Sequence, residues 1–235
     1  MKFKILFLAM LFLSACIAFP YEEVKELRLS AQDIEMLEIN CGAGFLKVTG
    51  YEGRNEIEVE AEIEVEGRRE RDTEEFIRKY VELSLEKRGR RAVLISNFKD
   101  FPKFFSLGNT VINLTVSIPK NMDLDINDGS GSIRVENIAG NVFVDDGSGS
   151  MEIENVEGSL QIEDGSGSIE VDDVRDDVDV DDGSGSISIR NIGGSVTVRD
   201  GSGSIYINGV EKDVFIPSEG SGGLRISNVK GKVKY

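Results

Sequence analysis

Histidine is absent from this 235-residue chain, and cysteine occurs only twice. Histidine is the side chain most often used as a general acid or base, and it is the commonest ligand of transition metals. The serines also lack a catalytic context, because no G-x-S-x-G turn occurs, and there is no G-x-G-x-x-G or Walker-type phosphate loop. The sequence therefore predicts a protein that is not an enzyme, and it assigns no catalytic residue.

The start of the chain predicts export. Lys2 and Lys4 precede an apolar run at residues 5–13, which small residues follow, as in a secretory signal. The run is shorter than the roughly 20 apolar residues that a membrane-spanning helix needs, which disfavours the alternative of a transmembrane anchor. No other segment is apolar enough to cross a bilayer.

The first cysteine lies in a motif for lipid attachment. Leu13-Ser14-Ala15-Cys16 resembles the bacterial lipobox, in which the cysteine is acylated and becomes the first residue after cleavage. We predict a signal peptide at residues 1–15, lipidation of Cys16 and a spacer at residues 16–30. The predicted location is outside the cytoplasm, anchored at the cell membrane or outer envelope. Ordinary cleavage after Ala18 is the alternative. With Cys16 acylated, Cys41 has no disulfide partner, so packing has to stabilise the fold.

Negative charge is concentrated in the middle of the chain. Residues 121–216 hold 22 acidic and five basic side chains, a net charge of −17, whereas the whole chain carries −16. Such a surface repels nucleic acid and anionic lipid headgroups, and it attracts cations or basic partners. We expect no nucleic-acid partner.

The same stretch is a strict repeat of eighteen residues. The sequence DGSGS begins at five positions, which are Asp128, Asp146, Asp164, Asp182 and Asp200. Aliphatic residues recur with the same period, and those of the first repeat are Ile133, Val135, Ile138, Val142 and Val144. Each repeat alternates with period two over two short stretches separated by turns rich in Gly, Asn and Asp, which is typical of strands. Strands this short bury an apolar face only by stacking about 4.8 Å apart, so the repeat predicts a parallel β-solenoid with 18-residue coils.

The region before the repeats predicts a cap. Residues 40–48 match the turn and first strand of a coil, with Cys41 in the aspartate position. We predict that the solenoid begins there, and that a strand at 56–65, a helix near 73–80, a hairpin at 81–97 and a strand at 111–118 follow. The predicted domains are a degenerate coil and cap at residues 31–120 and a regular solenoid at 121–235. The fold class is all-β, with one short helix.

The repeat units also carry a family resemblance. The lead-in PKNMDLDI and the repeated GSGSIxVxN and GxVxV units resemble the bacterial putative-adhesin family of β-strand repeat proteins, a domain of unknown function, and are similar to auto-transporter adhesin head domains. The resemblance covers roughly residues 39–235. It implies a surface or envelope location and an adhesive role, and it carries no catalytic residues to this chain.

The repeated aspartates are the candidate chemical site. Calcium prefers carboxylate and carbonyl oxygens, so weak calcium binding is predicted at Asp128, Asp146, Asp164, Asp182 and Asp200, next to Asp145, Glu163 and Asp181. The calcium-binding repeats of secreted toxins place aspartate where this chain has Ile133, so that likeness fails at the ligand. The alternative is that each aspartate accepts hydrogen bonds from amides of its own turn. No other cofactor is expected.

A phenylalanine-rich segment precedes the regular repeats. Its aromatic residues are Phe98, Phe101, Phe104 and Phe105. The segment folds over the open end of the core, inserts into a membrane or binds a partner. The predicted function is a non-enzymatic, envelope-anchored adhesin or binding scaffold that presents an acidic repetitive face to a surface polysaccharide or protein. The alternative is a component of envelope assembly or stress sensing that acts through the N-terminal part and this loop.

Overall fold

The computed structural model describes residues 21–65, 70–99 and 110–235. The N-terminal elements are β1 (Tyr21–Ser30), β2 (Met36–Tyr51), β3 (Glu56–Val65), α1 (Glu70–Tyr80), β4 (Val81–Arg88), β5 (Arg91–Phe98), β6 (Thr110–Pro119) and β7 (Asp123–Ile138). The later strands that form one face are β9 (Gly149–Val156), β11 (Gly167–Val174), β13 (Gly185–Ile192), β15 (Gly203–Val210) and β17 (Leu224–Val229). The strands of the opposite face are β8 (Val142–Asp146), β10 (Leu160–Asp164), β12 (Val178–Asp182), β14 (Val196–Asp200), β16 (Val214–Ser218) and β18 (Val233–Lys234).

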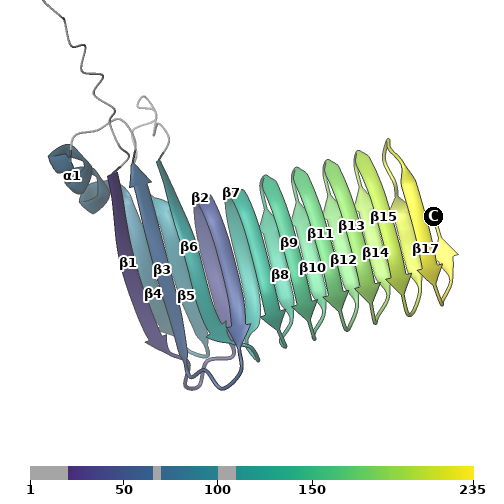
Figure 1. Ribbon diagram of the computed structural model, residues 1–235, viewed down its shortest axis with the longest axis horizontal. Coiled ribbons are helices and arrows are strands. Elements are labelled where there is room, and N and C mark those ends of the chain that lie inside the picture. Colours follow the sequence, from purple (N-terminus) through teal and green to yellow (C-terminus); the bar gives the residue numbers. More distant parts are fainter. Residues whose placement is uncertain (1–20, 66–69, 100–109) are drawn as a thin grey trace, which may run out of the picture.

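From β7 onward the chain winds as a regular parallel solenoid, seen as the stack of coils from teal to yellow in Figure 1. Each residue pairs with the residue eighteen positions away, so that Ile169 lies between Met151 and Ile187. The register slips only in the C-terminal coils, after Thr197 in the pairing of β14 with β16. The predicted 18-residue parallel β-solenoid is confirmed.

The core of the solenoid follows from the alternation of the strands. In β12 the side chains of Val178, Val180 and Asp182 point inward and are at most 2% exposed, while those between them face solvent. Identical aliphatic positions stack from coil to coil and form one continuous hydrophobic cluster that extends into the cap. Removing these large side chains from water is the main stabilising contribution to such a fold.

The turns of the solenoid rely on residues with positive φ. Asn137, Asn155, Asp173 and Asn191 have φ of 56–62° at one corner, a conformation that Asn and Asp tolerate better than other side chains. At the opposite corner the second glycine of each DGSGS has φ of 143–155°. These glycines also stack directly on one another between coils.

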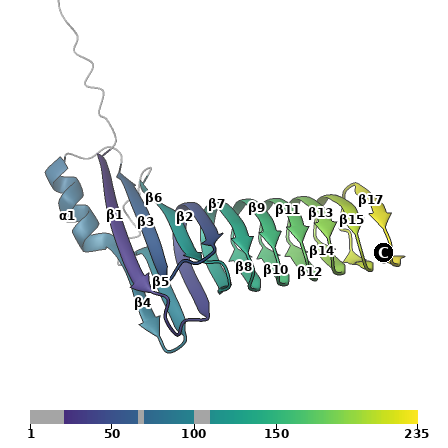
Figure 2. The ribbon, with the colours of Figure 1, turned by 60° about the horizontal axis from the view of Figure 1, so that its bottom comes forward.

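The cap is joined to the solenoid by β2, which forms a complete coil. Its first half pairs with β5 and its second half with β6, while its other edge pairs with β7 from Met36 to Thr49. In this register Cys41 lies beside Asp128, as predicted. The connection from β6 to β7 crosses the end of β2, where the Lys120 amide donates to the Tyr51 carbonyl oxygen (3.1 Å). In space β2 therefore lies between β5 and β6 on one side and β7 on the other (Figure 2).

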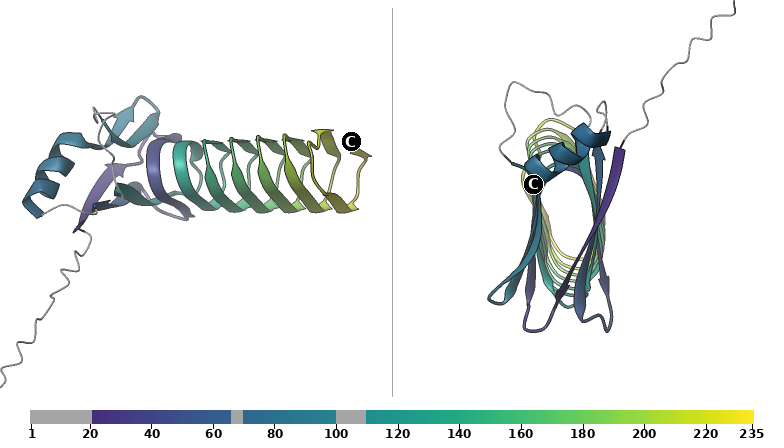
Figure 3. Two further views of the ribbon diagram at one scale, coloured as in Figure 1. Left: turned by 90° about the horizontal axis from the view of Figure 1, so that it is seen from above. Right: turned by 90° about the vertical axis from the view of Figure 1, so that its left-hand side faces the viewer.

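Antiparallel strands and one helix complete the N-terminal end. Strand β1 pairs with β3 and β3 with β6, and β4 forms a hairpin with β5. Figure 3 shows α1 across this end of the solenoid, where Phe76 and Ile77 are 2% exposed. The predicted β-rich cap with one short helix is confirmed. The predicted spacer at residues 16–30 overlaps β1 from Tyr21 onward, because that segment pairs along its whole length with β3.

Candidate functional site: the acidic ladder and the aspartate row

An uncompensated line of acidic side chains lies on the face built by β8, β10 and β12. Asp145, Glu163 and Asp181 follow one another in register, and we call them the acidic ladder. Asn127 donates to Asp145 (3.4 Å) and Gln161 to Glu163 (3.3 Å), but no basic residue of the described chain forms an ion pair with the three. The next position, Arg199, pairs with Asp179 instead (2.8 Å).

On the opposite face, built by β7, β9, β11 and β13, two arginines form ion pairs with most of the acidic side chains. Arg134 forms ion pairs with Glu136, Glu152 (2.7 Å) and Glu154 (3.6 Å). Arg190 pairs with Glu170 (2.5 Å). The two faces therefore differ in ion pairing, and only on the face of the acidic ladder do three carboxylates follow one another in register without a basic partner in the described chain.

The five repeated aspartates lie inside the solenoid and not on its surface. We call Asp128, Asp146, Asp164, Asp182 and Asp200 the aspartate row, and their side chains are only 2–7% exposed. In each, Oδ1 accepts a backbone N–H of its own turn at 2.9–3.2 Å, from Gly129, Ser148, Ser166, Ser184 or Ser202. The interpretation of these aspartates as turn acceptors is confirmed. The second oxygen, Oδ2, is buried and has no hydrogen-bond partner among the described residues.

Burial perturbs the titration of this row. Desolvation raises the pKa of all five carboxyls above the ordinary 3.8. With a further contribution from the neighbouring carboxylates, it raises the pKa of Asp146 and of Asp182 to about 6. Burial, followed by the charge of Asp128, also raises the pKa of the Cys41 thiol, so Cys41 stays protonated and unreactive.

The calcium hypothesis stays a prediction. Within the described part of the chain, no group of three or more Asp, Glu, Cys or His side chains is arranged to hold a metal ion. The aspartates lie about one coil spacing apart, and one oxygen of each is already used by its turn.

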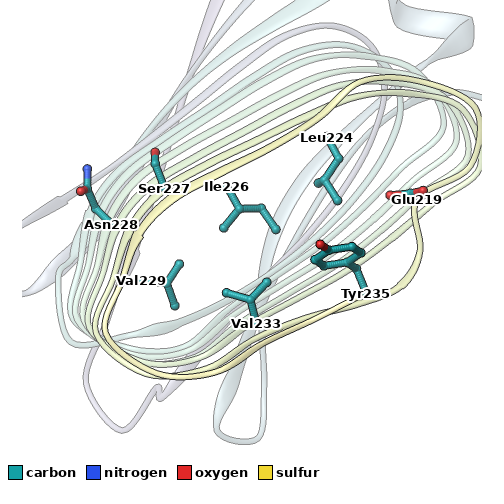
Figure 4. Close-up of a pocket in the computed structure, with 8 residues that line it drawn as sticks. All are labelled: Glu219, Leu224, Ile226, Ser227, Asn228, Val229, Val233 and Tyr235. Atoms are coloured by element: carbon teal, nitrogen blue, oxygen red, sulfur yellow. The ribbon is translucent and has the colours of Figure 1, made fainter.

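The hydrophobic core opens into a cavity of about 530 Å³ at the C-terminal coil (Figure 4). Leu224, Ile226, Val229 and Val233 point into it, and the ring of Tyr235 lies at its rim. Val233 is 39% exposed, whereas Val214, its counterpart in the preceding coil, is 1% exposed. This cavity offers apolar contact and not a cluster of reactive groups.

Two other predicted sites are only partly covered by the described residues. Phe98 packs against Phe76, with ring centroids 6.4 Å apart, so it belongs to the core of the cap. Phe101, Phe104, Phe105 and the lipidation residue Cys16 lie outside the described residues. Among the described residues, no helix has the length and apolar character needed to cross a membrane.

Sequence reasoning missed that the aspartate row is buried. The signal was present, because Val142, Val144 and Asp146 continue a single in-and-out alternation, and this places the carboxyl on the inner face. The sequence interpretation placed each aspartate in a turn and did not assign its side chain to the inner face.

One family of known proteins matches most of this chain. The family model Toastrack DUF4097 matches residues 34–233. Among solved structures, a putative cell adhesion protein from Clostridium sporogenes is 13% identical, with 92% of this chain and 98% of that chain covered and a TM-score of 0.33. A putative lipid binding protein from Parabacteroides distasonis is 15% identical (91% and 97% covered, TM-score 0.37). A putative adhesin from the same species is 13% identical (90% and 96% covered, TM-score 0.40). No curated protein matches the chain.

Proposed function

Since the chain belongs to the Toastrack DUF4097 family, we propose that it is a non-enzymatic scaffold of the cell envelope that binds a surface polysaccharide or protein through the acidic ladder. The observation that carries this proposal is a run of three carboxylates that lie in register and have no basic partner in the described chain. Arg134 and Arg190 neutralise carboxylates on one face, while Asp145, Glu163 and Asp181 form no ion pair within the described chain. Charges held in register on a rigid sheet attract a complementary partner at little conformational cost.

The proposed anchor is a lipid on Cys16. Strand β1 begins at Tyr21, five residues later, and five extended residues span at most about 18 Å. An acylated Cys16 therefore holds the cap close to the membrane surface. The C-terminal coils lie at the opposite end of the molecule from β1, so they are free to project away from the membrane (Figure 1).

Replacing Cys16 by serine is expected to abolish acylation, because the thiol is the atom that takes the lipid. In cells fed radiolabelled palmitate, the label should disappear from Cys16→Ser and the protein should leave the membrane fraction. Cys41→Ser is the control, since that thiol is buried against Asp128. Persistent label in Cys16→Ser would show that the lipobox interpretation is wrong.

Reversing the charge of the acidic ladder is expected to abolish binding. Beads coated with the protein would be applied to cells and to purified envelope polysaccharide of the producing species, and bound beads counted. The triple variant Asp145→Lys, Glu163→Lys, Asp181→Lys should bind at least about tenfold less, and wild-type binding should weaken with added salt.

A matched control reverses three acidic residues on the cap. Glu22, Glu26 and Glu60 are exposed on β1 and β3, so replacing them by lysine changes the net charge by the same amount. This variant should bind like the wild type. Equal losses in both triple variants would indicate a non-specific effect of net charge, and undiminished binding by the ladder variant would exclude the ladder as the binding surface.

A further inference from the structure

One oxygen of every carboxyl in the aspartate row is buried without a hydrogen-bond partner among the described residues. Leaving a buried polar atom unpaired is costly, and leaving it charged costs more. Five such atoms in consecutive coils therefore require an explanation. The three candidates are a trapped water, a cation and a proton.

The tight packing of this corner disfavours a water or a cation. The Oδ2 atoms are sealed from solvent. The neighbouring turns stack so closely that a Cβ on Gly147 would lie 2.5 Å from the Gly129 carbonyl oxygen, and a Cβ on Gly183 would lie 2.5 Å from that of Gly165. Calcium takes six to eight oxygen ligands at about 2.3–2.6 Å, and a trapped water needs two to four polar partners. A proton needs no additional volume.

The charged groups around the row also favour protonation. The negative charges of Asp128 and Asp164 add to the raised pKa of Asp146. Those of Asp164, Asp200 and the outward-facing Asp181 add to the raised pKa of Asp182. At the end nearest the cap, Cys41 of β2 lies beside Asp128. None of the side chains acting on the row within the described chain is basic, and Arg199 of β14 turns outward to Asp179.

We propose that the aspartate row is a proton-binding element of the folded solenoid, in which buried carboxyls of neighbouring coils retain protons that the unfolded chain releases. The fold is then more stable in mildly acidic solution than in alkaline solution. This inference concerns the interior of the coils and is independent of what the acidic ladder binds.

The direction of the pH dependence follows from linkage. The pKa of Asp146 and Asp182 is raised to about 6 by burial and by the neighbouring carboxylates, from an ordinary value of 3.8. A group with a raised pKa in the folded state binds a proton on folding. Its stabilising contribution is complete below about pH 4 and is lost as the pH rises through about 6. The solvent-exposed Glu52 and Glu58 have a pKa below the usual 4.5. Their titration changes the stability in the opposite direction, but only below about pH 4.5 and therefore outside the range from pH 5 to 8.

The test is thermal unfolding of the mature protein at pH 5 and pH 8. The wild-type Tm is expected to fall by about 5 °C or more between these values, on the scale of 2–4 °C per kcal/mol for a chain of this size. In Asp182→Asn the amide oxygen still accepts the Ser184 N–H, but the group carries no charge at either pH. Its Tm at pH 8 should match or exceed that of the wild type, and its fall between pH 5 and pH 8 should be smaller.

Glu163→Gln is the matched control, because it removes one negative charge from an exposed position on the same face, and Glu163 is not among the groups that raise the pKa of Asp182. It should keep the pH dependence of the wild type. Infrared spectroscopy of the wild type at pH 6 provides a readout that needs no variant, since a protonated carboxyl gives its own C=O stretching band and the pKa of Asp146 and Asp182 is about 6. Asp182→Asn should reduce that band and Glu163→Gln should leave it unchanged.

Three results would overturn the proposal. The first is a wild-type Tm that is constant or rises from pH 5 to 8, and the second is the absence of a protonated carboxyl band at pH 6. The third is a rise in Tm on adding millimolar calcium at pH 8 that disappears in Asp182→Asn, because it would assign the row to a cation. An unchanged Tm with calcium and with chelator is the result expected for protons.

Discussion

Replacing Gly167 by alanine is expected to lower the free energy of unfolding by about 4 kcal/mol or more, which is an unusually large effect for adding one methyl group. A Cβ at this position would lie 1.6 Å from the Gly149 carbonyl oxygen of the preceding coil. The backbone has φ of +154°, which side chains rarely adopt. The two coils have to separate to admit the methyl group, and the hydrogen bond from the Gly167 amide to the Ser184 carbonyl oxygen (2.9 Å) lies in the same corner.

Two control variants at other glycines distinguish the effect of steric contact on stability from the effect of backbone strain. Gly53 has φ of +69°, and a methyl group added there would have no atom within 4 Å, so Gly53→Ala should cost only about 1 kcal/mol. Gly223 is not in the left-handed region and the nearest contact of an added methyl group is Ser204 Oγ at 3.8 Å, so Gly223→Ala should be nearly neutral. The measurement is urea unfolding followed by circular dichroism. A loss for Gly167→Ala no larger than that for Gly53→Ala would mean that the coils separate at this corner at little cost.

Replacing Ile39 by alanine is expected to cost about 4 kcal/mol and to uncouple the cap from the solenoid. Ile39 is fully buried in β2, between Leu94 of β5 and Ile126 of β7, which are also fully buried. Truncating a buried isoleucine removes hydrophobic contact and leaves a cavity, at a typical cost of about 2–5 kcal/mol. Because a repeat protein is stabilised by contacts between neighbouring units, the weakened junction should unfold in a separate transition.

The control is Ile226→Ala in the C-terminal coil. Ile226 pairs with Ile207 on one side only and is half-buried, so its truncation should cost about 1 kcal/mol and affect only the last coils. Hydrogen exchange would locate the loosened amides, in β2, β5 and β7 for Ile39→Ala and in β15 and β17 for Ile226→Ala. Equal losses of stability in the two variants would contradict a special role of β2 at the junction.

The sequence predicted the chemistry of the candidate site, but it did not predict where the side chains lie in the fold. The hydrogen bonds of the aspartate row follow from the DGSGS turn, which the sequence displays. Its burial depends on the stacking of turns from different coils, with Gly165 and Gly183 in direct contact. The acidic ladder appeared as residues beside the row, but its lack of compensation depends on where Arg134, Arg190 and Arg199 point.

The amino-acid sequence alone determined the solenoid, its 18-residue coils and the strands of the cap other than β1. This was possible because period-two alternation and an unbroken 18-residue repeat leave one register in which every inward position is aliphatic or the turn aspartate. Only the tertiary structure decided that β2 lies between β5 and β6 on one side and β7 on the other, and that β1 begins within the predicted spacer. These features result from pairing between segments far apart in the chain, and local patterns do not encode the partner of a strand.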